Sequence, residues 1–111
     1  MRAVNMTVIY YKAVRDNIPK IIERSGKKCK FQQLPDEDYL PELEKKLSEE
    51  LKEYYSSRSI EELADIVEII NRILELRETK VEDFDEIRLD KKQMRGGFSE
   101  NYFLVEVQEN Q

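Results

Sequence analysis

The segment from Asp36 to Glu78 has the strongest pattern in the chain, because apolar residues recur in it at spacings of three and four, with one polar break, SSRS (56–59). Before the break the apolar positions are Leu40, Leu43, Leu47, Leu51 and Tyr54. Side chains at these spacings share one face of an α-helix, so a helix is predicted over 36–55, with Pro41 tolerated in its first turn. Two helices joined by so short a break form a helical hairpin, and the chain is therefore predicted to be all-α.

The helix predicted after the break, which ends near Glu78, carries two apolar stripes. One stripe consists of Leu63, Val67, Ile70 and Leu74, and the other of Ile66, Ile69, Ile73 and Leu76. Ser59 with Glu62 three residues later matches the capping-box signature for the start of this helix. Two stripes need two packing partners, so we expect the hairpin to pair with a second copy in a four-helix bundle. A homodimer is the smallest such assembly, and a higher homo-oligomer is the alternative.

Weaker helical patterns flank the hairpin on both sides. Residues 14–26 predict a short helix that Gly26 ends. Thr79 with Glu82 repeats the capping-box signature and predicts a further helix, which ends near Arg95. Both predicted helices are consistent with the all-α class.

Three short segments have patterns that are not helical. Residues 7–11 could form a short strand or an extended arm, and residues 27–36 a loop or an edge strand. Apolar and polar residues alternate over 102–107, which predicts a strand or an arm that packs across the helices. No repeat or linker divides the sequence, so residues 1–111 are expected to form one domain.

The composition excludes several classes of function. Charged residues make up 39% of the chain and the net charge is -5, so no broad basic surface is expected to bind nucleic acid. Histidine is absent, which removes the usual general base and every imidazole metal ligand. Cys29 is the single cysteine, which excludes an internal disulfide and fits a reducing cytoplasm. Because no run of about 18 apolar residues could span a bilayer, we expect a cytoplasmic protein without a membrane partner.

Two glutamates interrupt the apolar stripes of the predicted hairpin. Successive helical residues turn by roughly 100°, so Glu50 falls about 20° from Leu43, inside the buried arc. Glu62 falls one helical turn before the second stripe of its own helix. Each glutamate is followed three residues later by another carboxylate, Glu53 in the first helix and Asp65 in the second. In an antiparallel hairpin the two acidic pairs would face each other across one groove.

Four carboxylates in partly buried space repel one another, and burying an ionised carboxylate without a partner costs several kcal/mol. A cation is therefore expected between them. Oxygen ligands select a hard ion, so Mg²⁺ is the expected cofactor, with Mn²⁺ as the alternative. Two simpler interpretations stay open. The glutamates of the first helix could pair with Lys45, Lys46 or Lys52 on a solvated surface. Glu62 could serve only as the capping-box partner of Ser59.

These acidic residues also carry a resemblance to a known family. EELKE (49–53) followed by ELAD (62–65) resembles the EExxE…ExxD signature of the MazG-like, all-α nucleoside triphosphate pyrophosphohydrolases. This family is related to phosphoribosyl-ATP pyrophosphohydrolase and to the all-α dUTPases. The segment YYKAVRDNIPKIIERSGKK (10–28) is similar to the opening of a short-chain subgroup, and RGGFSENYFLVEV (95–107) is similar to its ending. The resemblance covers residues 10–107.

The resemblance implies Mg²⁺-dependent cleavage between the α and β phosphates, which releases a nucleoside monophosphate and pyrophosphate. Carried over position by position, it implies four metal ligands, namely Glu50, Glu53, Glu62 and Asp65. Glu49 matches a further position of the motif, and Glu49, Glu50 and Glu53 are the catalytic candidates. One departure from the family is the connection between the two halves of the motif, since residues 54–61 number only eight.

A triphosphate substrate also needs cationic ligands for its phosphates. Lys12 and Arg15 in the opening segment, and Arg95 beside Gly96 and Gly97, are the candidates. An arginine can make two parallel hydrogen bonds to a phosphate, and glycine lets the backbone come close to it. The alternative for all three basic residues is ordinary surface charge.

Two other functions stay open beside house-cleaning hydrolysis of nucleotides. One is a phosphoribosyl-ATP pyrophosphohydrolase role in histidine biosynthesis, which would use the same residues on another substrate. The other is a helical interaction module without catalysis, regulatory or antitoxin-like, whose carboxylates contact basic residues of a partner.

Overall fold

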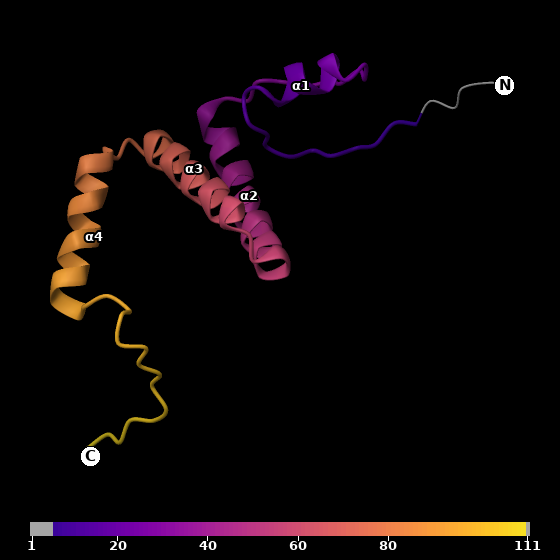
Figure 1. Ribbon diagram of the computed structural model, residues 1–111. Helices are drawn as coiled ribbons and strands as arrows, with labels where there is room; N and C mark the ends of the chain where they lie inside the picture. The colour runs from indigo at the N-terminus through magenta and orange to yellow at the C-terminus, as the bar shows by residue number, and fades with distance from the viewer. Residues whose placement is uncertain (1–5, 111) are drawn as a thin grey trace. The chain divides into compact units, whose positions relative to one another are not determined.

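The computed structural model describes residues 6–110 and divides between Glu78 and Thr79 into two compact units, each described here by itself. The first unit contains α1 (Ile18–Arg24), α2 (Asp36–Ser57) and α3 (Ile60–Leu76), and the second contains α4 (Val81–Arg95) (Figure 1). No strand forms anywhere in residues 6–110, which confirms the all-α class. No helix within this range is long and apolar enough to cross a membrane.

Helices α2 and α3 form the predicted hairpin and lie side by side (Figure 1). Arg58 ends α2 in the left-handed conformation, with φ 57° and ψ 22°, and its N–H donates to the Tyr54 carbonyl at 2.7 Å. Ser59 then starts α3 by accepting a hydrogen bond from the Glu61 N–H at 3.2 Å. The short connection noted in the sequence is therefore long enough for a tight turn between antiparallel helices.

The capping box predicted at Ser59 forms only in part. Ser59 is the N-cap, as predicted, but its own N–H donates to the Ser57 hydroxyl at 3.2 Å. In a complete capping box the Glu62 carboxylate would accept this N–H. The prediction of a full capping box is therefore wrong, because Ser57, at the end of the preceding helix, satisfies the donor first.

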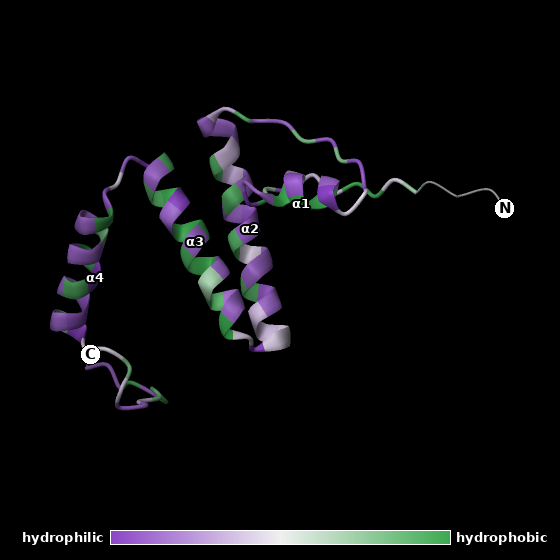
Figure 2. Ribbon diagram, turned by 45° about the horizontal axis from the view of Figure 1, so that its top comes forward, coloured by the Kyte–Doolittle hydropathy of each residue, from purple (hydrophilic) through white to green (hydrophobic). Residues whose placement is uncertain are grey.

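One of the two apolar stripes of α3 forms the core of the first unit. Ala13, Leu43 and Ile69 are buried, and Tyr39, Leu47, Ile73 and Leu76 pack against them. The other stripe is only partly covered: Leu63 and Val67 are 38% and 56% exposed, whereas Ile70 and Leu74 are half-buried. Figure 2 shows hydrophobic residues along much of α3. The partner subunit expected to cover the second stripe stays a prediction.

Residues 6–35, which precede α2, are irregular apart from one short helix. Residues 7–11 form no strand, so of the two predicted alternatives only an arm is compatible with the structure. Helix α1 has Pro19 in its first turn and is followed by Gly26 at φ 88°, a conformation that glycine adopts without strain. The predicted helix over 14–26 is thus confirmed in its centre and shorter at its start.

The second unit differs from prediction at the start of its helix and in the segment that follows the helix. Helix α4 begins at Val81 with Lys80 as its N-cap, and the Lys80 side chain makes no capping hydrogen bond, so the start of the helix lies one residue beyond the one predicted from Thr79. The helix ends at Arg95, as predicted. Residues 102–107 form no strand, and their apolar side chains, such as Tyr102 and Val105, are exposed rather than packed. The predicted strand is absent because a single alternating segment has no neighbouring strand to pair with.

Candidate metal centre

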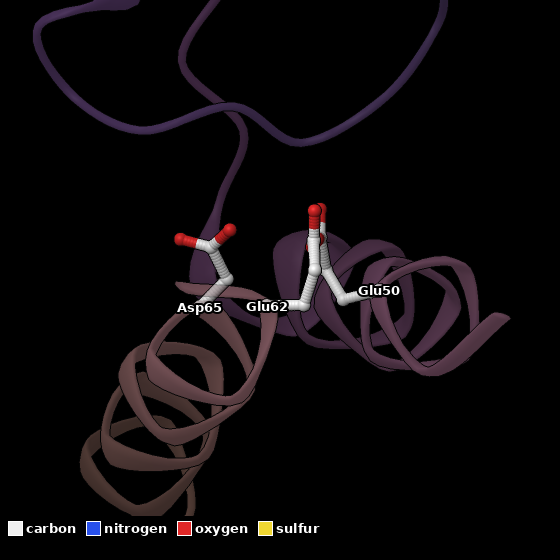
Figure 3. Close-up of side chains that lie close together, drawn as sticks. All are labelled: Glu50, Glu62 and Asp65. Carbon is white, nitrogen blue, oxygen red and sulfur yellow. The ribbon is translucent and has the colours of Figure 1, made fainter. Parts of the chain in front are cut away.

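Three carboxylates from the two helices of the hairpin meet at one point. Glu50 comes from α2, and Glu62 and Asp65 come from α3. One oxygen from each lies within 4.8 Å of the other two. Figure 3 shows the three side chains pointing to the same side of the hairpin. The spacing of three residues places Glu62 and Asp65 on one face of α3, and the antiparallel turn brings Glu50 opposite them.

Two carboxylate oxygens of this cluster are buried without a hydrogen-bond partner. Glu50 is only 7% exposed and is the one buried charged residue in the part of the chain that the structure describes. Its Oε1 lies 3.6 Å from the Lys46 Nζ, whereas its Oε2 and the Oε2 of Glu62 have no partner among residues 6–110. An unsatisfied buried acceptor is destabilising. The site is therefore built to accept something that the protein itself does not supply, either a proton or a cation.

The electrostatics of the cluster favour a proton on Glu62 when no metal is bound. Several effects together raise the pKa of Glu62 from an ordinary 4.5 to about 7. The largest is hydrogen bonding to the Glu50 side chain, and the next is burial. The negative charges of Glu53, Glu50 and Asp65 raise the pKa further. Two ionised carboxylates offer only acceptors to each other, and a proton on Glu62 supplies the missing donor. The cluster thus holds one proton below about pH 7 unless a cation replaces it.

This pKa predicts how the stability of the metal-free protein depends on pH. Above about pH 4.5 the unfolded chain releases the Glu62 proton, while the folded protein keeps it until about pH 7. The folded state therefore binds more protons over this range, and this glutamate makes the free energy of unfolding fall as pH rises from about 4.5 to about 7. The stabilisation that Glu62 contributes is fully present below about pH 4.5 and is lost above about pH 7.

The measurement is urea unfolding in a chelator across this pH range, with parent and Glu62→Gln compared. The parent curve minus the variant curve should slope downward, because glutamine cannot titrate. Glu68→Gln, at an exposed position of the same helix, should leave the parent slope unchanged. Parallel curves for the parent and Glu62→Gln would contradict the raised pKa.

The donor set of the cluster fits a small, hard divalent cation. Mg²⁺ binds oxygen at about 2.0–2.1 Å, so oxygens on opposite sides of its octahedron are about 4.2 Å apart. Neighbouring oxygens of the same octahedron are about 2.9 Å apart, so the three carboxylate oxygens, which lie within 4.8 Å of one another, would have to close by up to about 2 Å around the ion. Mg²⁺ usually keeps several waters beside a few carboxylates, and Mn²⁺ accepts the same ligands. Glu50, Glu62 and Asp65 are the residues that could hold it.

The structure places two other predicted residues beside the cluster rather than in it. Glu53 is exposed, and it lines an open hollow of about 550 Å³ together with Glu49 and Glu62. Its charge helps to raise the pKa of Glu62, so it lies within electrostatic reach. Glu53 as a fourth metal ligand, and Glu49 and Glu53 as catalytic residues, stay predictions.

The basic residues of the opening segment reach the hairpin. The Lys12 Nζ lies 3.2 Å from an oxygen of Glu49, and the Arg15 guanidinium donates a hydrogen bond to Asp65. Ala13, between them, is buried in the core and holds the segment in place. Arg95 belongs to the second unit, and its role in binding phosphate stays a prediction.

One residue beside the site was predicted only as a partner in surface ion pairs. Lys46 precedes Glu50 by one helical turn, and its side chain is only 16% exposed. The interpretation of surface ion pairs named this lysine, and the Lys46–Glu50 pair is present, while Lys45 pairs instead with Glu42 at 3.3 Å. The ion pair accounts for only one oxygen of Glu50, since the other has no partner among the described residues.

Comparison with known protein families, curated proteins and solved structures finds no match to the chain. The resemblance to the MazG-like pyrophosphohydrolases therefore stays a prediction that rests on the sequence motifs.

Proposed function

We propose that the protein is a Mg²⁺-dependent nucleoside triphosphate pyrophosphohydrolase. It cleaves between the α and β phosphates, gives a nucleoside monophosphate and pyrophosphate, and serves to remove unwanted nucleotides. The observation that carries the proposal is the pair of buried, unpartnered oxygens on Glu50 and Glu62, which face each other from two helices beside Asp65 within the described chain. With both carboxylates ionised, this arrangement is destabilising unless a cation lies between them, so a bound ion is its best explanation.

The residues in and around the cluster would have different roles in such a reaction. Glu50, Glu62 and Asp65 would hold the ion, which when bound neutralises phosphate charge and makes a water acidic enough to lose a proton near neutral pH. Glu53 and Glu49, on the adjoining hollow, are the candidate acceptors of that proton. Lys12 and Arg15 are the candidate ligands of the phosphates, and the same role for Arg95 stays a prediction from the sequence. No histidine is needed for these roles.

The hollow beside the cluster suits a nucleotide. Among its lining residues are two cationic side chains, Lys45 and Lys52, and three hydroxyls, Ser48, Ser56 and Ser57. Ammonium groups attract phosphate, and hydroxyls can exchange hydrogen bonds with ribose. The substrate is therefore expected to extend from the metal along this side of α2. Phosphoribosyl-ATP offers the same triphosphate chemistry and is a substrate to be tested beside nucleotides.

The test is a panel of standard and damaged nucleoside triphosphates, with phosphoribosyl-ATP, in the presence of Mg²⁺. We expect pyrophosphate and the matching monophosphate from at least one member of the panel, and neither product after chelation. A folded protein that releases no pyrophosphate from any member and is not stabilised by Mg²⁺ would instead support the helical interaction module.

A second copy of the chain is the proposed partner of the open stripe of α3. Leu63 and Val67 on this face are exposed, and removing such apolar area from water stabilises an assembly by about 25 cal/mol per Å². We expect a homodimer whose melting temperature rises with protein concentration, because dissociation accompanies unfolding. Val67→Lys should abolish that dependence, whereas Glu68→Lys, at the next and already polar position, should retain it. A parent protein that sediments as a monomer at micromolar concentration would contradict the bundle.

A further inference from the structure

The segment from Lys12 to Arg15 is fixed against the hairpin by apolar packing. Ala13 is buried beside Leu43 and Ile69, and the Val14 carbonyl accepts a hydrogen bond from the Tyr39 hydroxyl at 3.4 Å. The two basic side chains therefore leave an anchored backbone, and their reach is limited to the part of the hairpin that lies beside it.

These two side chains make ion pairs with both helices of the hairpin. Lys12 pairs with Glu49 on α2, 37 residues away in sequence, and Arg15 pairs with Asp65 on α3, 50 residues away. Local helix geometry cannot create contacts at such separations, so the fold itself brings these charges together. Of the two acidic partners, only Asp65 belongs to the three-carboxylate cluster.

The basic residues around the cluster pair with some of its carboxylate oxygens and leave others without a partner among residues 6–110. Lys46 lies at one oxygen of Glu50, and Arg15 is bonded to Asp65. The Oε2 atoms of Glu50 and Glu62 have no partner within residues 6–110, and the Glu50 side chain is about nine-tenths buried. The guanidinium of Arg15 is thus bonded to a carboxylate that a bound ion would need. Glu50 and Glu62 each keep one oxygen without a partner in the described chain.

We propose that Arg15 is an internal counter-cation that a divalent ion displaces. In the metal-free protein it neutralises Asp65; when the ion takes Asp65 as a ligand, the guanidinium is released and binds the phosphates that the ion brings with it. This exchange rests on the proposed function of the site. It is chemically reasonable because one planar guanidinium can make the same pair of hydrogen bonds to a carboxylate or to a phosphate.

The exchange gives Arg15 two effects of opposite sign. It weakens binding of the metal alone, since the ion must compete for Asp65, and it strengthens binding of the metal with a polyphosphate. The Arg15 and Asp65 side chains are 55% and 37% exposed, and ion pairs this open change an equilibrium by at most about fivefold. After the exchange the guanidinium binds a polyphosphate, which is more highly charged than Asp65. Removing the Arg15 guanidinium should therefore weaken polyphosphate binding by about tenfold.

The test is calorimetric titration of the full chain with Mg²⁺ alone, followed by titration with inorganic tripolyphosphate at saturating Mg²⁺. Arg15→Gln should bind Mg²⁺ alone about threefold more tightly than the parent and tripolyphosphate about tenfold more weakly. Arg24→Gln is the matched control, because it removes the same charge from an exposed position at the end of α1. It should match the parent in both titrations. Arg15→Lys keeps the charge and loses the planar fork, so it should bind Mg²⁺ as the parent does and tripolyphosphate more weakly.

Each outcome decides between the exchange and its absence. If Arg15→Gln and Arg24→Gln bind Mg²⁺ equally, the exchange is wrong, while a parent that binds Mg²⁺ leaves the proposed metal site standing. If Arg15→Gln tightens Mg²⁺ binding without weakening tripolyphosphate binding, the guanidinium is not passed to phosphate and the exchange is again wrong. If neither the parent nor any variant binds Mg²⁺, both the exchange and the proposed function are overturned.

Discussion

Glu62→Gln should lower pyrophosphate release by about 100-fold or more while the hairpin stays folded, because it removes a charge from the centre of the proposed metal site. Glutamine keeps the size of the side chain and can donate a hydrogen bond to the Glu50 oxygen that otherwise has no partner among residues 6–110. A loss of this size with an unchanged fold would assign the glutamate to chemistry rather than to structure. Steady-state hydrolysis of the best nucleotide of the panel measures it.

Glu61→Gln is the control for this variant. Glu61 is the exposed neighbour in the same first turn of α3, so its substitution removes the same charge from the helix N-terminus without touching the cluster. It should retain close to the parent rate. A capping role for Glu62 would tolerate glutamine, since a capping box accepts either residue. Full turnover by Glu62→Gln would therefore overturn the metal site. Glu50→Gln should lose activity to the same extent.

Saturating Mg²⁺ should stabilise the parent by about 2 to 3 kcal/mol, and should stabilise Glu50→Gln and Glu62→Gln much less. Mass action gives this value for a ligand at about a hundred times its Kd that binds only the folded state. The condition is met because the three carboxylates come from two helices and assemble only when the hairpin folds. Urea unfolding with Mg²⁺ and with a chelator measures the difference.

Without metal, the same variants should be as stable as the parent or more stable. The parent places facing carboxylates in partly buried space, and each substitution replaces one of them by a neutral amide that can donate. Glu68→Gln, away from the cluster, should gain as much from Mg²⁺ as the parent does. Equal Mg²⁺ stabilisation of the parent and both cluster variants would show that the ion binds elsewhere.

Regular helices were predicted well where the apolar period was long. Helix α2 begins at Asp36 as predicted and extends two residues beyond the predicted end, because Ser56 and Ser57 continue the helix until Arg58 turns left-handed. The short alternating segments were predicted poorly. Residues 102–107 carry a pattern of period two, yet a strand exists only when another strand pairs with it, and a pattern within one segment says nothing about such a partner.

The candidate site was predicted more fully than the contacts around it. Periodicity alone placed Glu50 and Glu62 on buried faces, and the structure brings their carboxylates together with that of Asp65. Glu53 stands in the same relation to Glu50 as Asp65 does to Glu62, but it lies on the open hollow. Both follow their glutamate by three residues and so lie about 60° round the helix. Only the way the two helices pack decides which of these flanks turns toward the cluster.

The sequence by itself determined the all-α class, the position of the hairpin and the faces that carry its glutamates, because each depends on side chains within a few turns of one helix. Only the tertiary structure decided that Lys12 lies on Glu49, across 37 residues of chain. It also decided that Arg15 lies on Asp65, across 50 residues of chain. Helical periodicity repeats every few residues and holds no information about which distant segment packs against a face, so these contacts follow from the packing of Ala13 in the core.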